Sequence, residues 1–81
     1  MQVKKRDGSL QGFDREKLKG SVVAAGVADN EAESLTAGVE VWMEGAAVDG
    51  AVESQAIWEK VYGELQGLNS EAAEAYRKFR G

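Results

Sequence analysis

The sequence predicts an α+β fold in which a β-hairpin and a short third strand cap a bundle of four α-helices. In residues 2–13, apolar and polar side chains alternate on either side of an Asp-Gly pair, a pattern that is typical of a hairpin. Four amphipathic segments follow within residues 14–80, each with a capping residue at its start. A short stretch at residues 51–53 separates the second segment from the third. The length of 81 residues fits one domain, residues 1–81.

The predicted hairpin turns at Asp7-Gly8. Val3 and Lys5 alternate on its first strand, and Phe13 ends its second. Asp-Gly is the favoured pair for a two-residue type I′ turn, because both central residues need a positive φ. A lone hairpin is only marginally stable in water, so we expect this one to pack against the helices.

The first helix is predicted from Asp14 to about Ala25. Asp14 is a favourable N-cap. With that cap, Phe13 and Leu18 have the spacing of a hydrophobic staple, which fixes how the hairpin enters the helix. Gly26 is a suitable residue to end the helix.

The second helix is predicted to start at Asp29 or Asn30. With Asn30 as the cap, Glu33 falls at the N3 position of a capping box. Residues 45–50 are expected to form a loop. The apolar stripe of this helix consists of Ala32, Leu35, Val39 and Trp42.

The third and fourth helices complete the predicted bundle. Ser54 is expected to cap the third helix, which Gly67 would break. Asn69 or Ser70 would cap the fourth helix, which runs through Phe79. The third helix buries Ile57, Val61 and Leu65, with Trp58 and Tyr62 alongside, and the fourth buries Ala72, Ala73, Tyr76 and Phe79.

Three predicted helices contain an internal glycine, at Gly20, Gly38 and Gly63. Each glycine costs about 1 kcal/mol relative to alanine. A tight helix crossing or the close approach of a ligand would explain such a residue, and a locally weak helix is the alternative.

The composition excludes several classes of catalytic site. The chain has no cysteine and no histidine, so it has no disulfide, thiol nucleophile, Cys/His zinc site or Ser-His-Asp triad. We therefore predict a non-enzymatic protein without a metal centre. No apolar run reaches the roughly 18 residues of a membrane span, and no signal-peptide pattern opens the chain. With the lack of cysteine, this favours a cytoplasmic location.

Charge is distributed unevenly along the chain, whose net charge is −4. Residues 1–20 and 73–81 carry more bases than acids, whereas residues 21–72 carry one base, Lys60, against ten acids. Basic ends that meet in space would form a local anion site. The alternative is that the acids cover solvated helix faces and that the bases at positions 4–6 protect an edge strand from aggregation.

Such an anion site can be assembled from separated segments. Lys5 and Arg6 are adjacent on a strand, so one would face the helices and the other would lie at the rim. Lys17 lies in the first turn of the first helix, and the start of the third helix at Ser54 offers free N–H groups. The fourth helix adds two candidate phosphate contacts, Arg77 and Lys78.

Two motifs of the sequence resemble the signature of ATP-cone domains. Residues 3–8 read Val-Lys-Lys-Arg-Asp-Gly, and residues 13–18 read Phe-Asp-Arg-Glu-Lys-Leu. Residues 52–57 and 75–80 resemble the family's third strand and terminal aromatic-basic helix less specifically. ATP-cone domains are regulatory modules of many ribonucleotide reductases and of the bacterial repressor of reductase genes.

The resemblance implies a non-catalytic module that binds ATP or dATP, with or without Mg²⁺, between a hairpin lid and the helices. Binding would control a partner, through self-association or through a ribonucleotide-reductase-related protein. Asp14 would lie near the adenine or ribose, Lys5 and Arg6 near the phosphates and the base, and Lys17 and Ser54 near the phosphates. The implied nucleotide-binding residues are Val3, Lys5, Arg6, Asp14, Lys17 and Ser54.

Two positions depart from the family pattern. Gln11 stands where certain dATP-binding members have glutamate, and Trp58 stands where some members have histidine. Two alternatives therefore stay open: a degenerate cone that is a protein–protein interaction module without nucleotide, and a basic hairpin that binds nucleic acid. The net charge of −4 argues against nucleic acid.

Overall fold

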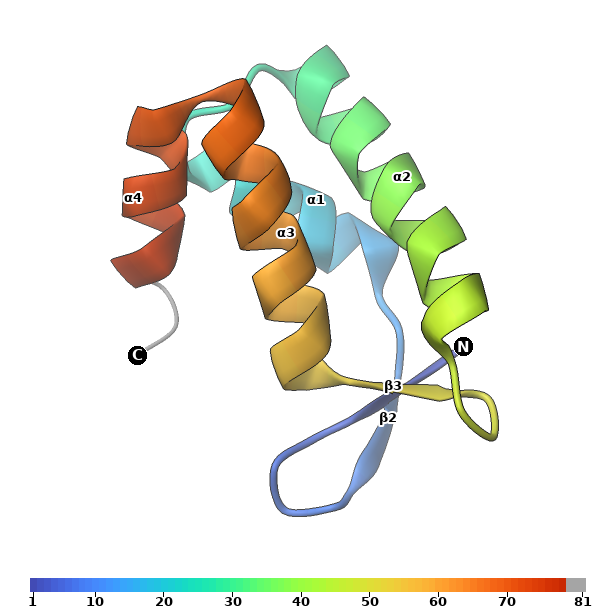
Figure 1. Cartoon of the computed structure of the whole chain (residues 1–81). Helices are drawn as coiled ribbons and strands as arrows, with labels where there is room; N and C mark the ends of the chain where they lie inside the picture. Colours follow the sequence, from blue (N-terminus) through green and yellow to red (C-terminus); the bar gives the residue numbers. More distant parts are fainter. Residues whose placement is uncertain (79–81) are drawn as a thin grey trace.

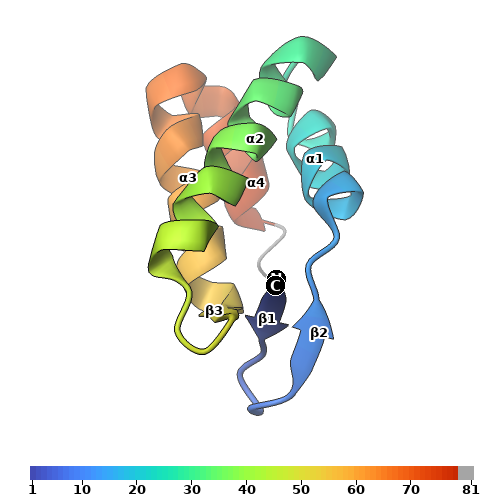
Figure 2. The same ribbon diagram turned by 90° about the vertical axis from the view of Figure 1, so that its right-hand side faces the viewer.

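A computed structural model describes residues 1–78 as a three-stranded sheet set at one end of a helical bundle (Figures 1 and 2). The predicted α+β fold is confirmed. The predicted end of the fourth helix at Phe79 lies outside the described residues. In chain order the elements are β1 Gln2–Lys4, β2 Leu10–Gly12, α1 Arg15–Ala24, α2 Asp29–Ala46, β3 Ala51–Glu53, α3 Ser54–Leu68 and α4 Ser70–Lys78.

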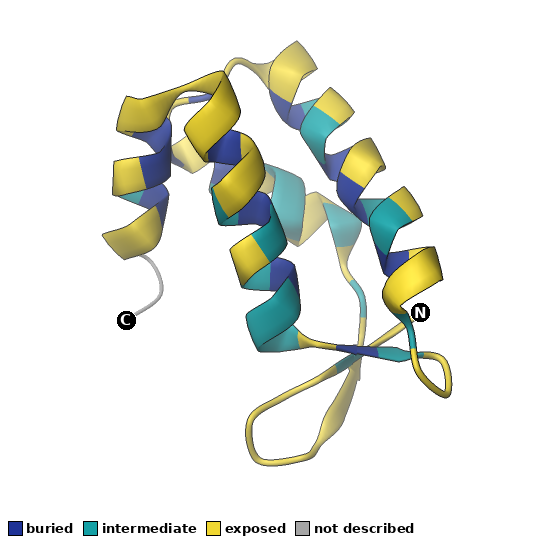
Figure 3. Ribbon diagram, viewed as in Figure 1, coloured by how far each residue is buried: buried dark blue, intermediate teal, exposed yellow. Residues whose placement is uncertain are grey.

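The sheet has the strand order β2-β1-β3, with β1 in the centre. Val3 lies opposite Gln11 in the antiparallel pair and opposite Val52 in the parallel pair. Val52 is buried, whereas the hairpin is exposed along nearly its whole length (Figure 3). The hairpin is thus joined to the bundle through β3 and through its covalent link to α1.

The turn of the first hairpin differs from the type I′ prediction. The Lys5 carbonyl accepts from Gly8 N at 2.9 Å, and Lys5 N donates to the Ser9 carbonyl at 2.9 Å, which leaves a three-residue loop. Gly8 has a φ of 88°, while Asp7 is not among the described residues with a positive φ. This is the pattern of a three-residue hairpin loop that needs glycine at one position only.

The first helix is bounded as the sequence predicts. The Asp14 carboxylate accepts from Lys17 N at 3.1 Å and caps α1. At the other end Gly26 has a φ of 111°, and its N–H bonds the Val23 carbonyl at 2.9 Å. A positive φ directly after the last helical residues is the usual role of glycine at a helix end.

The second helix starts at Asp29 as predicted, but its predicted cap and the predicted ends of two helices are wrong. α2 has Ala28 as its cap and no side-chain capping bond, so the Asn30 capping box does not form. α2 also continues past Gly45 to Ala46, and α3 continues past Gly67 to Leu68. Exposed glycines weaken a helix without ending it, and no clash or positive φ stops these two.

Ser54 is the first residue of α3, and its predicted capping role is not observed. Glu53 stands at the cap position without a side-chain capping bond. β3 runs directly into α3, so Glu53 is held in the extended conformation by its pairing opposite Lys4. The capping prediction for the fourth helix is confirmed, because the Asn69 side chain accepts from the backbone N–H groups of Glu71 and Ala72 at 3.1 Å each.

The core lies between the four helices and the inner face of β3. The predicted inner-face residues of α3 and those of α4 up to Tyr76 are buried, while Phe79 lies outside the described residues. In α2, Leu35 and Trp42 of the predicted stripe are only half-buried, and Thr36 and Met43, which the stripe did not include, are buried. Trp58 stacks on Tyr62 and Tyr76 at centroid distances of 5.1 and 6.0 Å. The fully buried larger side chains are Met43, Leu65, Val22, Val39, Val61 and Thr36.

Arg15 joins the first two helices. Its Nε donates to Glu40 at 3.0 Å, and its guanidinium also pairs with Glu33 and Glu16. Lys19 Nζ approaches Glu33 at 3.3 Å and Asp29 at 3.4 Å. The Arg15 hydrogen bond, followed by that of Lys19, holds the pKa of the Glu33 carboxyl below its ordinary value. Glu33 therefore ties α2 to α1 instead of capping its own helix.

The helical glycines Gly20, Gly38 and Gly63 do not mark tight helix crossings. A Cβ atom built at any of them would have no neighbour within 4 Å. A locally weak helix and the close approach of a ligand both stay open as explanations at these positions.

Candidate functional site

A cleft opens between the hairpin, the start of α1 and the start of α3. Its volume is about 280 Å³. The hairpin contributes one wall, which includes Val3 and Lys5. The opposite wall is helical and partly apolar. The residues lining this cleft are Val3, Lys5, Gln11, Gly12, Phe13, Asp14, Lys17, Leu18, Ser21, Ser54 and Ile57.

A second hollow, here called the tip hollow, continues from the cleft beneath the loop of the hairpin. It has a volume of about 460 Å³ and shares Lys5 and Ser54 with the cleft. The two therefore adjoin at these residues and are together called the depression here, while the tip hollow also borders a further hollow at Lys4, Gly8 and Glu53. The tip hollow is lined by Lys4, Lys5, Arg6, Asp7, Gly8, Glu53, Ser54 and Gln55.

The two parts differ in chemistry. The cleft has an apolar side formed by Phe13, Leu18 and Ile57, all packed on or in the core. The tip hollow has three bases and the first residues of α3, where helical N–H groups lack intrahelical acceptors. Such a helix N-terminus, next to bases, favours an anion. An amphipathic ligand with a flat apolar end and an anionic end would match this arrangement.

Four bases of the described chain are paired with carboxylates, but those around the depression are not. Arg15, Lys19, Lys60 and Arg77 each pair with a carboxylate. Among residues 1–78 the bases without a carboxylate partner within salt-bridge distance are Lys4, Lys5, Arg6, Lys17 and Lys78. Four of these five line the cleft or the tip hollow. This concentration of unpaired positive charge is the strongest electrostatic feature of the site.

The sequence-based picture of Lys5 and Arg6 needs one correction. Arg6 lies in the loop and not on the strand, so strand alternation does not place it at the rim. Its Nη2 instead donates to Gln55 Oε1 on α3 at 3.3 Å. Both bases therefore face the tip hollow, and Gln55 is a lining residue that sequence reasoning missed.

Asp7, which lines the tip hollow, and Asp14, which lines the cleft, are already bound within the chain. Ser9 donates to the Asp7 carboxylate from its hydroxyl at 2.6 Å and from its amide at 2.9 Å. These hydrogen bonds hold the pKa of Asp7 below its ordinary value. Asp14 Oδ1 caps α1, while its side chain also lines the cleft. Both carboxylates thus have structural roles that leave the bases available.

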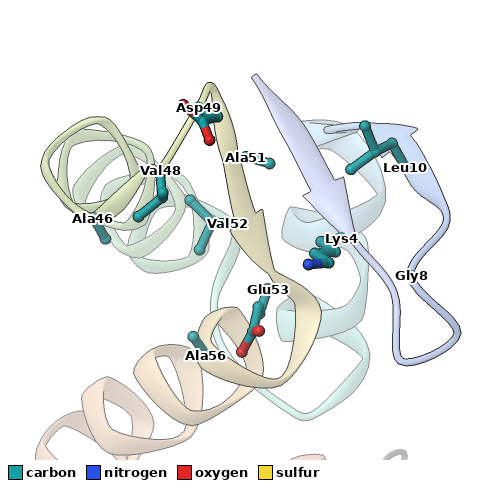
Figure 4. A pocket seen from close by; sticks show the side chains of 10 residues that line it. All are labelled: Lys4, Gly8, Leu10, Ala46, Val48, Asp49, Ala51, Val52, Glu53 and Ala56. Carbon is teal, nitrogen blue, oxygen red and sulfur yellow. The ribbon is translucent and has the colours of Figure 1, made fainter.

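The opposite face of the sheet carries a third hollow of about 680 Å³ (Figure 4). Lys4 and Leu10 extend toward it from the hairpin, together with small side chains such as Ala46 and Ala51. Lys4 also borders the tip hollow but does not line the cleft. Lys4 and Lys5 therefore lie toward different faces of the sheet, as the alternation of side chains along a strand predicts.

The structure brings together most but not all of the predicted site residues. Val3, Lys5, Asp14, Lys17 and Ser54 line the cleft, and Arg6 lines the tip hollow. The two candidate contacts from the fourth helix, Arg77 and Lys78, line neither part, and Arg77 pairs with Glu74 at 3.0 Å.

The two departing positions are also separated. Gln11 lines the cleft, whereas Trp58 lines neither part and lies in the aromatic stack with Tyr62 and Tyr76. Ser21, which sequence reasoning did not select, lines the cleft from α1. Its only sequence signal is its spacing of four residues from Lys17, which places both on one helix face.

Comparison with known protein families decides what this arrangement corresponds to. The sequence profile described as the ATP cone domain matches residues 1–81. The chain belongs to the ATP cone domain family. No curated protein matches the sequence significantly.

Membership of this family gives the chain a coarse function. An ATP cone is a nucleotide-binding regulatory domain and is not catalytic by itself. Within residues 1–78 there is no cluster of three or more side chains suited to hold a metal ion. No helix in the same part of the chain is long and apolar enough to span a membrane.

Proposed function

We propose that this ATP cone binds ATP or dATP, with the adenine against the apolar side of the cleft and the triphosphate extending from the Lys17 side of the cleft, past Ser54, into the tip hollow. The unpaired bases Lys5, Arg6 and Lys17 support this proposal above all, because a triphosphate needs clustered cations. Ser54 lies where the two parts meet, at the start of α3. Its hydroxyl and the N–H groups of that helix end would receive phosphate oxygens.

The apolar side of the cleft suits the adenine ring. Phe13 and Leu18 are half-buried and adjoin the core, and Val3 faces them from the sheet. A purine placed here would bury apolar surface, which is the usual basis of affinity in small-molecule pockets. Asp14 would lie beside the base or ribose, because one of its carboxylate oxygens caps α1 and the other is free to accept from the ligand.

The consequence of binding would be regulatory. A nucleotide that bridges the hairpin, α1 and α3 would fix the hairpin on the bundle and so change the surface that a partner meets. That partner would be a second copy of this chain or a ribonucleotide-reductase-related protein in the cytoplasm. Mg²⁺ would enter as the companion of the triphosphate, since it is commonly held by phosphates with one or two protein ligands.

Calorimetric titration of the whole chain with ATP, dATP and GTP tests the proposal. We expect both adenine nucleotides to bind, and GTP to bind more weakly. A chain that binds none of the three would be a degenerate cone that acts through protein contacts alone. Binding of DNA or RNA with a steep salt dependence would instead favour the nucleic-acid alternative.

A further inference from the structure

A chain of two side-chain hydrogen bonds links the hairpin tip to α3. Arg6 Nη2 donates to Gln55 Oε1 at 3.3 Å, and Gln55 Nε2 donates to Glu59 Oε2 at 3.0 Å. Within residues 1–78, the Arg6–Gln55 bond is the only side-chain hydrogen bond or ion pair between the hairpin and the helices. The loop of residues 5–9 otherwise extends beyond the bundle (Figure 1).

The direction of this chain is fixed by Glu59. An ionised carboxylate only accepts hydrogen bonds, so it selects the orientation of the Gln55 amide in which the NH₂ group faces Glu59. The amide oxygen then faces Arg6. Residues 55 and 59 are four apart on α3, which places them on one helix face. Glu59 thus determines that the amide oxygen of Gln55, and not its NH₂ group, faces the hairpin.

Gln55 engages only one of the hydrogen-bond donors of Arg6. A guanidinium has five N–H donors, and one of them is engaged by Gln55. Arg6 has no carboxylate partner within the described residues, so its charge is not neutralised. The remaining donors can bind an anion in the tip hollow that Arg6 and Gln55 both line.

We infer that Gln55, oriented by Glu59, is a positioning residue that places Arg6 over the tip hollow before nucleotide binds. This inference rests on the proposed function, because it assigns the tip hollow to phosphate. Positioning reduces the conformational freedom that Arg6 and the loop lose on binding, and less loss means higher affinity. Neither Gln55 nor Glu59 needs to touch the ligand for this effect.

Glu59 makes the inference testable, because two explanations predict opposite signs. A carboxylate near the bases repels an anion, so through charge alone Glu59→Ala would strengthen ATP binding. If Glu59 orients Gln55, the same substitution weakens binding. Glu71→Ala is the matched control, since it removes the same charge from the first turn of α4, away from both parts of the site.

The experiment measures ATP affinity by calorimetry for the whole chain and its variants. We expect Gln55→Ala and Glu59→Ala to weaken binding about 2- to 10-fold, the equivalent of one net hydrogen bond. Glu71→Ala should leave affinity nearly unchanged. In the Arg6→Ala background, adding Gln55→Ala should cause no further loss, because Gln55 acts through Arg6.

A measurement on the free protein separates failure of this inference from failure of the proposed function. Backbone order parameters at residues 6–8, from ¹⁵N relaxation, should fall in Gln55→Ala and Glu59→Ala. Unchanged order parameters, or tighter ATP binding by Glu59→Ala, would overturn the positioning role. If the unmodified chain binds no nucleotide, the proposed function fails and the order parameters alone decide whether the tether exists.

Discussion

Removal of single bases around the cleft is the most direct test of where phosphate binds. Lys5 and Lys17 line the cleft from different elements, and neither has a carboxylate partner among the described residues. Both are exposed, so Lys5→Ala and Lys17→Ala should change the free energy of unfolding by no more than about 0.5 kcal/mol. Loss of a charge-assisted phosphate contact should cost about 1.5–3 kcal/mol of binding free energy. That cost corresponds to roughly 10- to 100-fold weaker ATP binding.

Two other bases provide the controls for this experiment. Lys4 borders the tip hollow but lies mainly toward the opposite face of the sheet, so Lys4→Ala should lose only about 2-fold in affinity through weaker long-range attraction. Lys60→Ala changes the net charge equally at a site that lines neither part, where Lys60 pairs with Glu64 at 3.0 Å.

The assay is calorimetric titration with ATP, with folding of each variant checked by urea denaturation. A large loss for Lys17→Ala and for Lys5→Ala or Arg6→Ala, with Lys4→Ala and Lys60→Ala near the unmodified affinity, is the expected result. Equal small losses in all five variants would refute the reasoning, because they would show diffuse attraction without a defined phosphate site.

Four further outcomes are expected. At one hundred times its Kd, ATP should stabilise the fold by about 2.7 kcal/mol and raise the Tm by roughly 10 °C, which thermal denaturation with and without ATP would measure. Gly63→Ala, at an exposed position of α3 with no neighbour within 4 Å of a new Cβ, should raise the free energy of unfolding in urea by about 1 kcal/mol. Thr36→Val should also stabilise the fold in urea, by about 1 kcal/mol, because the fully buried Thr36 hydroxyl has no hydrogen-bond partner among the described residues. The pKa of Glu33 lies below its ordinary value of 4.5. The ion pairs of Glu33 therefore stabilise the fold above pH 4.5, and this stabilisation is lost as pH falls through the lowered pKa. In acid denaturation, Glu33→Gln should lose less stability than the unmodified chain as pH falls.

The order of elements could be predicted because each has a local signal. The Asp14 cap and Gly26 at the end of α1 depend only on nearby backbone groups, and the structure contains both features. Strand β3 was also predictable, because its residues lie between two strong helical patterns. Its parallel pairing with β1 follows once the hairpin and α3 lie at the same end of the bundle.

The two Asp-Gly pairs show where local signals are insufficient. Asp49 and Gly50 both have a positive φ, at 53° and 76°, and reciprocal backbone hydrogen bonds join Val48 and Ala51. These are the features of the type I′ turn that the sequence predicts at the first pair. At Asp7 the carboxylate instead accepts from Ser9, two residues further along, and the loop takes in a third residue. Both turns contain the same Asp-Gly pair, so the residues next to the pair determine which type of turn forms.

Glu33 shows the same limit at the level of helix packing. From the sequence it is a capping-box residue of α2, because only its own helix is considered. In the structure it binds Arg15 and Lys19 of α1, since the two helices pack side by side. A charge-assisted contact to two bases stabilises Glu33 more than one backbone amide does. Residues far apart in sequence therefore determine its role.

The candidate site depends both on local motifs and on contacts between distant residues. Motif positions supplied Val3, Lys5, Asp14, Lys17 and Ser54, and the fold brings all of them to one cleft. Sequence could not show which bases remain free, because that depends on which carboxylates each base can reach after folding. Lys19 lies two residues from Lys17 on the same helix, yet it is held by α2. Lys17 is left unpaired because it lies on the helix face toward the hairpin, where the described chain offers no carboxylate within salt-bridge distance. An acidic protein can thus present a basic site, since its excess acids pair with bases elsewhere or cover other faces.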